Sequence, residues 1–294
     1  GSVVGAFADY DLDGWLDVLI LTNQVDGTEP NGRPDRLFRN LGNGRFTEVT
    51  AAAGIDSTSF GHAATWFDYN GDRYPDLYIC NDFAGPDSFF HNNGDGTFTD
   101  RIDELAPHTP YSSMGADFGD LNNDGHFDLL VSDMATTTRE RDRRGLAASR
   151  ADVLTTSAKE GIAPQYTRNA LLVNTGVGPF QEAACWADLD ATDWTWSVRF
   201  EDFDNDGWED LHVTNGMVRE ANNSDLLLRM MKALSDMQRI AVIKRSPELR
   251  ESNLAYRNLG GGRFEPVTED WGLADVGVSF GAATADFDND GRPD

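Results

Sequence analysis

Short apolar runs recur along the chain, and each of the first four follows a turn rich in aspartate. These runs are Val18–Leu21, Leu77–Ile79, Leu129–Val131 and Leu211–Val213. Runs this short, bounded by turn residues, are typical of strands that are buried on both faces. Further apolar segments, such as Leu37-Phe38 and Leu171–Val173, come before glycine-rich turns. The pattern therefore predicts many short strands joined by tight turns.

A glycine-rich pattern, N-x-G-x-G-x-F, separates the aspartate-rich turns. It begins at Asn40, Asn92, Asn174 and Asn258. Its glycines supply the positive φ that tight hairpin turns need. The closing Phe lies 22 positions before the next aspartate-rich turn in four cases out of four, whereas the separation from the first Asp of a turn to the Asn varies from 24 to 56. Because one half of the repeat has a fixed length and the other half varies in length, we expect one rigid unit per repeat with insertions at a single loop.

One repeat consists of strand, acidic turn, strand, connection, strand, glycine hairpin and strand. Four antiparallel strands in roughly 50 residues are typical of a β-propeller blade. We predict an all-β fold, a single β-propeller fragment of four-stranded antiparallel blades over residues 1–294. The expected blades are approximately 1–55, 56–108, 109–191, 192–275 and an incomplete 276–294. Because the chain opens at Gly1 and stops within a repeat at Asp294, we expect both ends to be cut from a longer protein.

Two partly helical insertions are predicted, at 139–165 and 218–250. The first is charged and rich in Ser, Thr and Ala, with weak helical character. In the second, apolar residues recur at roughly helical spacing after Ser224, which predicts a helix with a Ser224 cap that packs on the rim or face of the propeller. These residues are Leu227, Leu228, Met231, Leu234 and Ile240. Because long insertions are often functional, a partner or ligand-site element is the alternative to plain packing.

The aspartate-rich pattern, D-x-[DN]-x-D-x-x-x-D, occurs five times. Its side chains are Asp9, Asp11, Asp13 and Asp17; Asp68, Asn70, Asp72 and Asp76; Asp120, Asn122, Asp124 and Asp128; Asp202, Asp204, Asp206 and Asp210; and Asp286, Asp288, Asp290 and Asp294. Calcium takes about 6–8 oxygen ligands, and a tight turn with oxygens at positions one, three, five and nine can surround one ion. Without metal, such close carboxylates repel each other. We therefore predict up to five Ca2+ ions, with the backbone carbonyl of position seven as a further ligand.

Other metal-binding repeats fit less well. An EF-hand needs a Glu at its twelfth position, and aliphatic residues stand there instead: Ile20, Ile79, Val131 and Val213. Thrombospondin-type acidic repeats need many cysteines, and magnesium prefers to keep several waters. The second turn has Arg73 in place of the usual glycine, and the fifth turn ends at Asp294 with no strand after it. The occupancy of these two turns stays open.

Composition limits the possible partners. Fifty acidic residues against 24 basic ones give a net charge of −26, which repels nucleic acid and anionic membranes. Five calcium ions would offset ten of these charges. No apolar stretch of 18 or more residues occurs, so we expect no direct membrane insertion. The two cysteines, Cys80 and Cys185, adjoin apolar segments and are predicted to be buried free thiols.

The acidic turns, together with a preceding Phe-Gly or similar pair, resemble the FG-GAP repeats of integrin α-chain propellers and the bacterial VCBS repeats. The pairs are Phe60-Gly61, Met114-Gly115 and Phe280-Gly281. Segments 39–55 and 165–217 look like the cartilage acidic protein and ASPIC/UnbV group. The resemblance covers essentially the whole chain. It implies a ring of about seven blades, calcium in the blade loops, and a secreted or surface protein, but no reaction.

Catalytic motifs such as HExxH, GxSxG and the P-loop are absent, and the five histidines are scattered. Whether the chain is an enzyme stays open, with the balance against it. Trp194 and Trp196 could line a sugar-binding surface through stacking. A buried or bottom-face position is favoured, because Met114 and Phe280 occupy the place equivalent to Trp196.

Three functions are compatible with these features. The first is a calcium-binding scaffold for adhesion or binding, with an unidentified protein or glycan partner. The second is the propeller domain of a carbohydrate-active enzyme, in which the 139–165 insertion could shape the site. The third is a purely structural repeat module. Calcium at millimolar levels suits an extracellular, cell-surface or periplasmic location, and few cysteines are compatible with it.

Overall fold

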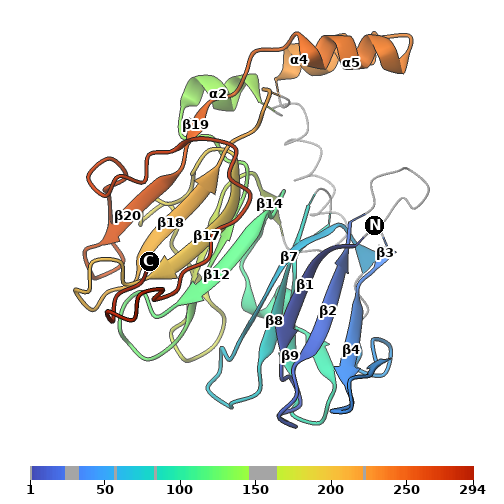
Figure 1. The fold of residues 1–294 in the computed structure, drawn as a ribbon, viewed down its shortest axis with the longest axis vertical. Helices are drawn as coiled ribbons and strands as arrows, with labels where there is room; N and C mark the ends of the chain where they lie inside the picture. Colours follow the sequence, from blue (N-terminus) through green and yellow to red (C-terminus); the bar gives the residue numbers. More distant parts are fainter. Residues whose placement is uncertain (1, 24–32, 56–57, 83–84, 146–163, 221–222) are drawn as a thin grey trace.

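The computed structural model describes residues 2–23, 33–55, 58–82, 85–145, 164–220 and 223–294. Within these ranges the chain forms four antiparallel sheets of four strands, and each sheet contains its strands in chain order (Figure 1). The strands are β1 (Ser2–Ala8), β2 (Asp17–Thr22), β4 (Arg36–Asn40) and β5 (Phe46–Glu48); β7 (Gly61–Phe67), β8 (Asp76–Asn81), β9 (Ser88–Asn92) and β10 (Phe98–Asp100); β12 (Gly115–Gly119), β13 (Asp128–Ser132), β15 (Ala170–Val173) and β16 (Gln181–Glu182); and β17 (Thr195–Glu201), β18 (Asp210–Asn215), β20 (Leu254–Asn258) and β21 (Phe264–Pro266).

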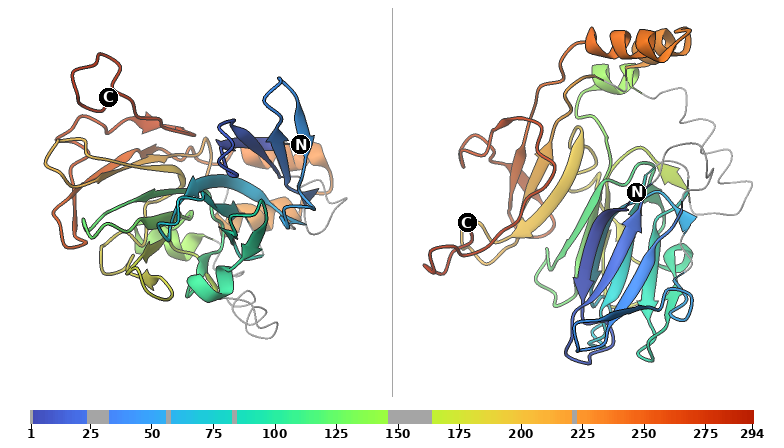
Figure 2. Two further views of the ribbon diagram at one scale, coloured as in Figure 1. Left: turned by 90° about the horizontal axis from the view of Figure 1, so that it is seen from below. Right: turned by 45° about the vertical axis from the view of Figure 1, so that its right-hand side comes forward.

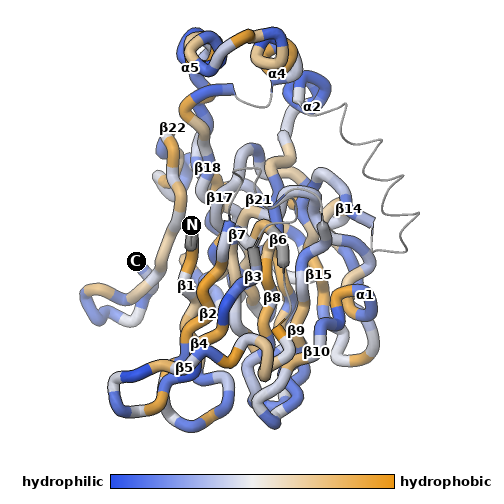
Figure 3. The backbone as a smooth tube through the Cα atoms, turned by 90° about the vertical axis from the view of Figure 1, so that its right-hand side faces the viewer, coloured by the Kyte–Doolittle hydropathy of each residue, from blue (hydrophilic) through white to orange (hydrophobic). Residues whose placement is uncertain are grey.

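The hydrophobic cores lie between neighbouring sheets, because the second strand of a sheet presents side chains to both sides. Leu77 and Ile79 of β8 pack in one cluster with Leu19 of the first sheet. Tyr78 and Cys80, at the alternate positions, pack in another cluster with residues of the third sheet. Successive side chains of a strand point to opposite faces, and all six residues of β8 are buried. Apolar residues accordingly follow strands such as β2 and β8 (Figure 3), which confirms the prediction of doubly buried strands.

The sheets follow one another in chain order through their first strands. β1 contacts β7, β7 contacts β12, and β12 contacts β17. At Gly115 a Cβ would lie 2.8 Å from the carbonyl oxygen of Trp196, so only glycine fits between β12 and β17. This face-to-face succession is propeller-like. The described residues form an open series of four sheets (Figure 2), so they do not show the expected ring of about seven blades.

In the described part of the chain, three short strand pairs and the helical turn α1 (Ile102–Leu105) lie outside the four sheets. The pairs are β3 (Arg33–Pro34) with β6 (Thr58–Ser59), β11 (Thr109–Pro110) with β14 (Gln165–Tyr166), and β19 (Glu251–Ser252) with β22 (Val276–Gly277). The helical turn follows β10. Two of the three pairs join segments that the sequence assigns to successive repeats, so they add a second connection between them.

The two insertions follow second strands of the sheets and are partly helical, as predicted. The described part of the 139–165 insertion contains α2 (Arg139–Arg144), and 146–163 lies outside the described residues. The second insertion forms two helices, α4 (Ser224–Met231) and α5 (Asp236–Lys244). The single helix expected from the spacing is thus interrupted, because Ser235 accepts a hydrogen bond from the Gln238 N–H and begins a new helix.

The predicted Ser224 cap is wrong. The side-chain oxygen of Asn223 caps α4 by accepting a hydrogen bond from the N–H of Asp225 at 3.0 Å. Ser224 is the first helical residue, and its hydroxyl donates to the carbonyl oxygens of Arg144 and Gly145 at 2.9 and 2.8 Å. The serine therefore holds the two insertions together instead of capping the start of its own helix.

The expectation that the second insertion packs on the rim or face of the propeller is also wrong. Both helices extend away from the sheets (Figure 1), and α5 has no buried side chain. Seven large apolar side chains of the second insertion are exposed: Val218, Leu228, Met231, Leu234, Met237, Ile240 and Ile243. α4 and α5 contact each other, and an apolar periodicity alone does not specify the surface against which a helix packs.

Cys80 is buried as predicted, whereas Cys185 is exposed. Cys185 lies in the turn after β16, where its neighbours Ala184 and Ala187 fill the core, and this leaves the thiol outside. Among the described residues, no helix has the length and apolar character needed to cross a bilayer.

Candidate metal centres in the acidic turns

Each acidic turn is held in the same conformation by its own carboxylates. In the fourth turn, Asp202 accepts the N–H groups of Asp206 and Gly207 at 3.0 and 2.9 Å, and Asp206 accepts the N–H of Trp208 at 2.9 Å. The same three bonds occur in the other four turns at 2.7–3.1 Å. The sixth residue has a positive φ every time, including Arg73 at 80°. This conformation explains why glycine is usual there.

The ninth position of each complete repeat is a buried aspartate that binds backbone. Asp210 accepts the N–H of Phe203, within its turn, at 3.0 Å and the N–H of Asn258, in the hairpin, at 2.8 Å. Equivalent bonds of 2.7–3.3 Å are made by Asp17, Asp76 and Asp128. Burial raises the pKa of Asp17 and Asp210 to about 6, and that of Asp76 and Asp128 to about 7, although these donors oppose the rise.

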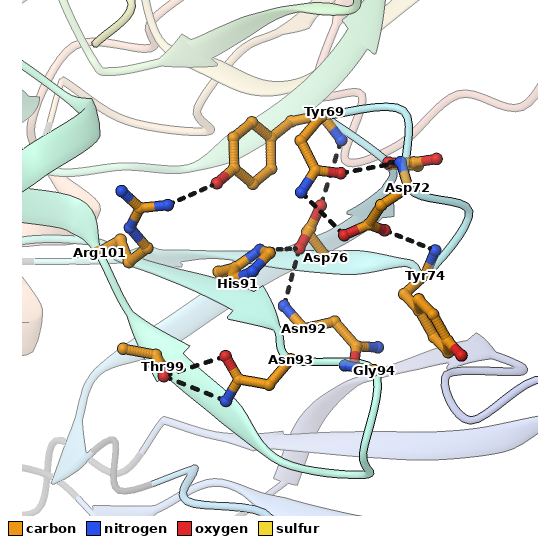
Figure 4. Close-up of polar contacts among 12 residues, drawn as sticks. Tyr69, Asp72, Tyr74, Asp76, His91, Asn92, Asn93, Gly94, Thr99 and Arg101 are labelled. Carbon is orange, nitrogen blue, oxygen red and sulfur yellow. Dashed lines mark hydrogen bonds and ion pairs between the residues drawn. The ribbon is translucent and has the colours of Figure 1, made fainter. Parts of the chain in front are cut away.

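The hairpin asparagines connect each sheet with the acidic turn of the sheet before it. The side-chain amide of Asn92 donates to the carbonyl oxygen of Tyr10 at 2.8 Å, while its N–H binds Asp76. Figure 4 shows Asp76 between Tyr69, His91 and Asn92. The equivalent amide bonds run from Asn174 to Tyr69 at 2.7 Å and from Asn258 to Leu121 at 2.9 Å. The turns are therefore both candidate metal sites and joints between sheets.

The hairpin glycine makes room for the seventh residue of the acidic turn. A Cβ on Gly42 would lie 2.7 Å from the Trp15 indole nitrogen, and one on Gly260 would lie 2.9 Å from the Trp208 ring. Both glycines also have positive φ, at 69° and 73°. The first glycine of the N-x-G-x-G pattern is therefore required by this contact as well as by the hairpin turn.

Three of the turns bring three carboxylates together. Positions one, three and five offer oxygens that all lie within 4.8 Å of one another in the Asp9-Asp11-Asp13, Asp202-Asp204-Asp206 and Asp286-Asp288-Asp290 triads. Two oxygens on opposite sides of a Ca2+ ion, each at about 2.3–2.6 Å, are about 5 Å apart, so one ion fits each triad. Two carboxylates at this separation repel by about 3 kcal/mol at an effective dielectric constant of 20. A divalent cation would replace that repulsion by attraction.

The first triad also contains an oxygen suited to a cation. Oδ1 of Asp11 is buried and has no hydrogen-bond partner among the described residues. Burial raises the pKa of this carboxyl group, and the Arg39 guanidinium opposes the rise. A buried carboxylate oxygen without a donor is costly unless it is bound, and hard cations prefer oxygen ligands of this kind. The donor set of the first turn therefore fits calcium.

Two arginines at the triads were missed by the sequence interpretation. Nε of Arg39 lies 2.7 Å from Asp11 Oδ2, and Nη2 lies 3.0 Å from Asp13 Oδ2. Nε of Arg257 lies 2.7 Å from Asp204 Oδ2. Both arginines come directly before a hairpin asparagine. This position beside a recognised motif could have identified them from the sequence. They give the first and fourth triads a partial countercharge.

The other predicted ligands are placed differently. In the second and third turns the middle position is an amide, and the oxygens of Asn70 and Asn122 each accept an N–H within their own turn at 3.0 Å. All three residues of the fifth triad are exposed, yet their turn keeps the common hydrogen bonds without a following strand. Calcium ligation in these turns, and by the ninth-position aspartates, stays a prediction.

The tryptophan pair predicted as a possible sugar surface is divided between two environments. The Trp196 indole N–H donates to the carbonyl oxygen of Gly216 at 2.6 Å, and its ring lies 5.0 Å from that of Phe280. Trp196 is therefore a packing residue, as favoured from the sequence. Trp194 instead lines a cavity at the opposite end of the sheets from the acidic turns.

The repeat matches a known family. A family model described as an FG-GAP-like repeat matches residues 9–79, 68–131, 149–213 and 240–294. The chain belongs to the FG-GAP-like repeat family. The matched segments contain all five acidic turns. The narrower resemblance to the ASPIC/UnbV group stays a prediction.

The solved structures that resemble this chain do so distantly, and one of them is a lectin. A lectin from Agrocybe aegerita, described as specifically recognising non-reducing terminal N-acetylglucosamine, is 14% identical over 90% of this FG-GAP-like chain, with a TM-score of 0.36. The chain covers 64% of that lectin chain. A likeness at this level supports no statement about ligand. The comparison with curated proteins found no match.

Proposed function

We propose that this FG-GAP-like chain is a calcium-binding scaffold for adhesion or binding, outside the cell, at its surface or in the periplasm. The observation that carries the proposal is the set of three carboxylate triads, each compact enough to surround one ion. Five turns with one hydrogen-bond pattern then provide up to five places for Ca2+.

Charge and compartment support the same role. A chain with a net charge of −26 destabilises its own compact state by self-repulsion unless cations are bound. Extracellular calcium modules work with dissociation constants of about 10⁻⁴–10⁻³ M, which match a compartment rich in calcium. Because the turns also join neighbouring sheets, bound calcium would stiffen the array and present its surfaces to a partner in a fixed arrangement.

Calorimetric titration tests the proposal directly. Protein freed of metal is titrated with CaCl2 and, separately, with MgCl2. We expect between three and five calcium ions to bind and magnesium to bind much more weakly. Asp204→Asn should remove one calcium ion from the stoichiometry, whereas Glu265→Gln, an equal change of charge at an exposed strand position, should leave it unchanged. Absence of saturable calcium binding would falsify the proposal.

A further inference from the structure

The two helices of the second insertion form a helical hairpin, residues 223–250, that projects from the sheets (Figure 1). Its base is fixed on both sides. Nη1 of Arg219 donates to the carbonyl oxygen of Ser246 at 2.6 Å, and the N–H of Glu220 donates to that of Pro247 at 3.2 Å. The Ser224 hydroxyl joins the hairpin to α2. The hairpin is therefore held at a defined place, with its outer surface turned away from the sheets.

Large aliphatic side chains are exposed along the whole hairpin. Leu234, in the link between the helices, is 93% exposed, and Met237, at the start of α5, is 83% exposed. Residues three and four apart on a helix are neighbours, so Met237, Ile240 and Ile243 follow one side of α5. Exposed apolar surface of this kind marks a site of association with a protein or a membrane. The exposed members are Leu228, Met231, Leu234, Met237, Ile240 and Ile243.

The hairpin is basic, whereas the rest of the chain is strongly acidic. Residues 223–250 contain six Arg or Lys and three Asp or Glu, a net charge of +3, which leaves 18 basic and 47 acidic residues elsewhere. Two arginines pair with acids of the hairpin itself, each at 3.2 Å. The other four cations are exposed and make no ion pair within the described residues. They are Arg229, Lys232, Lys244 and Arg245. Four unpaired cations in so acidic a chain point to an anionic partner outside it.

The cations lie beside the apolar side chains. Lys232 comes four residues after Leu228, and Lys244 comes four residues after Ile240, so each lysine is the neighbour of an exposed aliphatic residue. Helices that combine exposed aliphatic side chains with Lys and Arg are typical of elements that lie in the interface of a membrane. One surface of the hairpin can thus meet acyl chains and lipid phosphates together.

We infer that the helical hairpin binds the surface of an anionic lipid bilayer, with its aliphatic side chains at the headgroup boundary and its lysines and arginines beside lipid phosphates. A fluid bilayer needs no matching shape, so it accepts apolar side chains that extend over a protruding tip. The hairpin also contains no Trp or Tyr, two of the residues that dominate protein–protein hot spots. The bilayer is therefore favoured over a protein partner.

The net charge of the whole chain does not prevent this contact. The acidic turns of the four sheets lie at the opposite end of the strands. β17, with seven residues, spans about 23 Å at ~3.3 Å per residue, whereas charge interactions in physiological salt decay over about 8 Å. The inference goes beyond the proposed scaffold role and concerns a surface without acidic turns, so it can fail while calcium binding is confirmed.

Sedimentation with vesicles in calcium buffer tests the inference. One set of vesicles contains phosphatidylcholine and phosphatidylglycerol in equal parts, and the other contains phosphatidylcholine alone. We expect the full chain to sediment with the anionic vesicles and to stay in solution with the neutral ones. Binding should weaken in high salt, because screening shortens the range of charge interactions.

Charge reversal on the hairpin should weaken binding. Lys232→Glu together with Lys244→Glu should do so at least about tenfold, because each lysine near an anionic surface contributes about fivefold. The matched control is Arg45→Glu together with Arg263→Glu, an equal change of charge at exposed positions in two glycine hairpins. The control should bind as the unchanged protein does.

Replacement of apolar side chains separates membrane contact from simple charge attraction. Leu234→Ser together with Met237→Ser should weaken binding at least about tenfold, because these side chains would leave the acyl boundary. Val177→Ser together with Leu259→Ser alters two exposed aliphatic residues of the glycine hairpins and should change nothing. All four positions are exposed, so the variants should fold.

A fluorescent label gives a second readout in a chain with an intact charge pattern. Leu234→Cys in a Cys185→Ser background carries an environment-sensitive fluorophore, since Cys80 is buried. Anionic vesicles should shift its emission to the blue, whereas a label at Val177→Cys should not respond. An unshifted emission at Leu234→Cys overturns the inference.

Other outcomes overturn the inference as well. They are the absence of binding to anionic vesicles, equal binding to neutral vesicles, and binding that survives both double replacements on the hairpin. Binding of an acidic protein in place of the vesicles, lost in the same variants, would assign the hairpin to a protein partner and overturn the membrane assignment.

Discussion

At one end of the sheets the acidic turns repeat the same set of hydrogen bonds, whereas at the other end one bond is common to all four sheets. There the N–H after each second strand, or at its end, donates to a side-chain oxygen before the third strand. These bonds run from Thr22 to Asp35, Asn81 to Asp87, Asp133 to Asn169 and Asn215 to Asn253, at 2.8–3.0 Å. Further bonds at that end recur in two repeats, such as those from the N–H of Ser113 to the carbonyl oxygen of Asn81 and from the N–H of Ser279 to that of Asn215, at 3.1 and 3.0 Å, whereas the helical insertions belong to the third and fourth repeats. The comparison teaches that one end maintains the array and the other is free to acquire a function.

Removal of calcium should have the largest effect, because it acts on the repeated end in several turns at once. A ligand at 100 times its dissociation constant stabilises by about 2.7 kcal/mol per site, and 1 kcal/mol shifts the melting temperature of a protein of this size by roughly 2–4 °C. We expect chelation to lower the melting temperature by more than about 10 °C in scanning calorimetry. Magnesium should not restore it. An unchanged melting temperature in chelator would show that calcium in the turns does not contribute to stability.

Two substitutions within one turn distinguish metal ligation from backbone bonding. Asp210→Asn replaces an acceptor oxygen that faces a backbone N–H, so we expect it to cost about 1–3 kcal/mol with or without calcium. Asp206→Asn should cost stability only in calcium, because in chelator it relieves repulsion within the triad. Urea unfolding in both buffers measures each value. Equal costs for the two variants in chelator would contradict this division of roles.

The end of the sheets that carries the acidic turns was largely predictable from the spacing of the sequence motifs. Strand order, doubly buried second strands and hairpin glycines follow from local patterns that recur at fixed distances. The hydrogen bonds that join neighbouring sheets could not be predicted from this spacing. The amide of Asn92 reaches Tyr10, which is 82 positions away, and nothing in a single repeat specifies which carbonyl it finds. Arg39 was adjacent to a recognised motif, yet its contact with Asp11 depends on the three-dimensional turn.

The variable end was predictable only in outline. The sequence located both insertions, but the Asn223 cap and the helix break at Ser235 depend on local side-chain geometry. The cavity brings Tyr111, Trp194 and Glu251 together from distant segments, and no periodicity relates them. Trp194 was noted as a candidate for sugar stacking, and its placement came from the meeting of the insertions.

The pH dependence of stability tests the end of the sheets opposite to the acidic turns, where the carboxyl group of Asp87 is buried. Burial raises the pKa of Asp87 to about 7 from its usual 3.8, and the carboxylate accepts bonds from Asn81, Tyr78 and Ser113. The folded protein therefore holds a proton that the unfolded chain loses, so this contribution to stability is present below pH 4 and is lost as pH rises to about 7. The slope reaches up to about 1.4 kcal/mol per pH unit. Asp87→Asn should flatten it in urea unfolding between pH 4.5 and 7.5, and an unchanged slope would contradict this origin.

The smallest effect is expected on the outer insertion. Leu234 is 93% exposed, so Leu234→Ala should change the free energy of unfolding by no more than about 0.5 kcal/mol. Leu226, at 6% exposure, provides the matched substitution, and Leu226→Ala should cost about 2 kcal/mol or more. Thermal unfolding of both variants measures the difference. Equal costs would show that the outer surface of the helices is covered.

The direction of the asparagine joints has a consequence for synthesis on the ribosome. The amides of Asn92, Asn174 and Asn258 all reach back to a carbonyl that was translated earlier, and none of these bonds points forward. Each newly emerged repeat therefore finds the carbonyl that its asparagine binds already translated. An additional copy joined after the fourth repeat would dock by the same rule at Phe203, the residue equivalent to Leu121, without any change to the preceding ones.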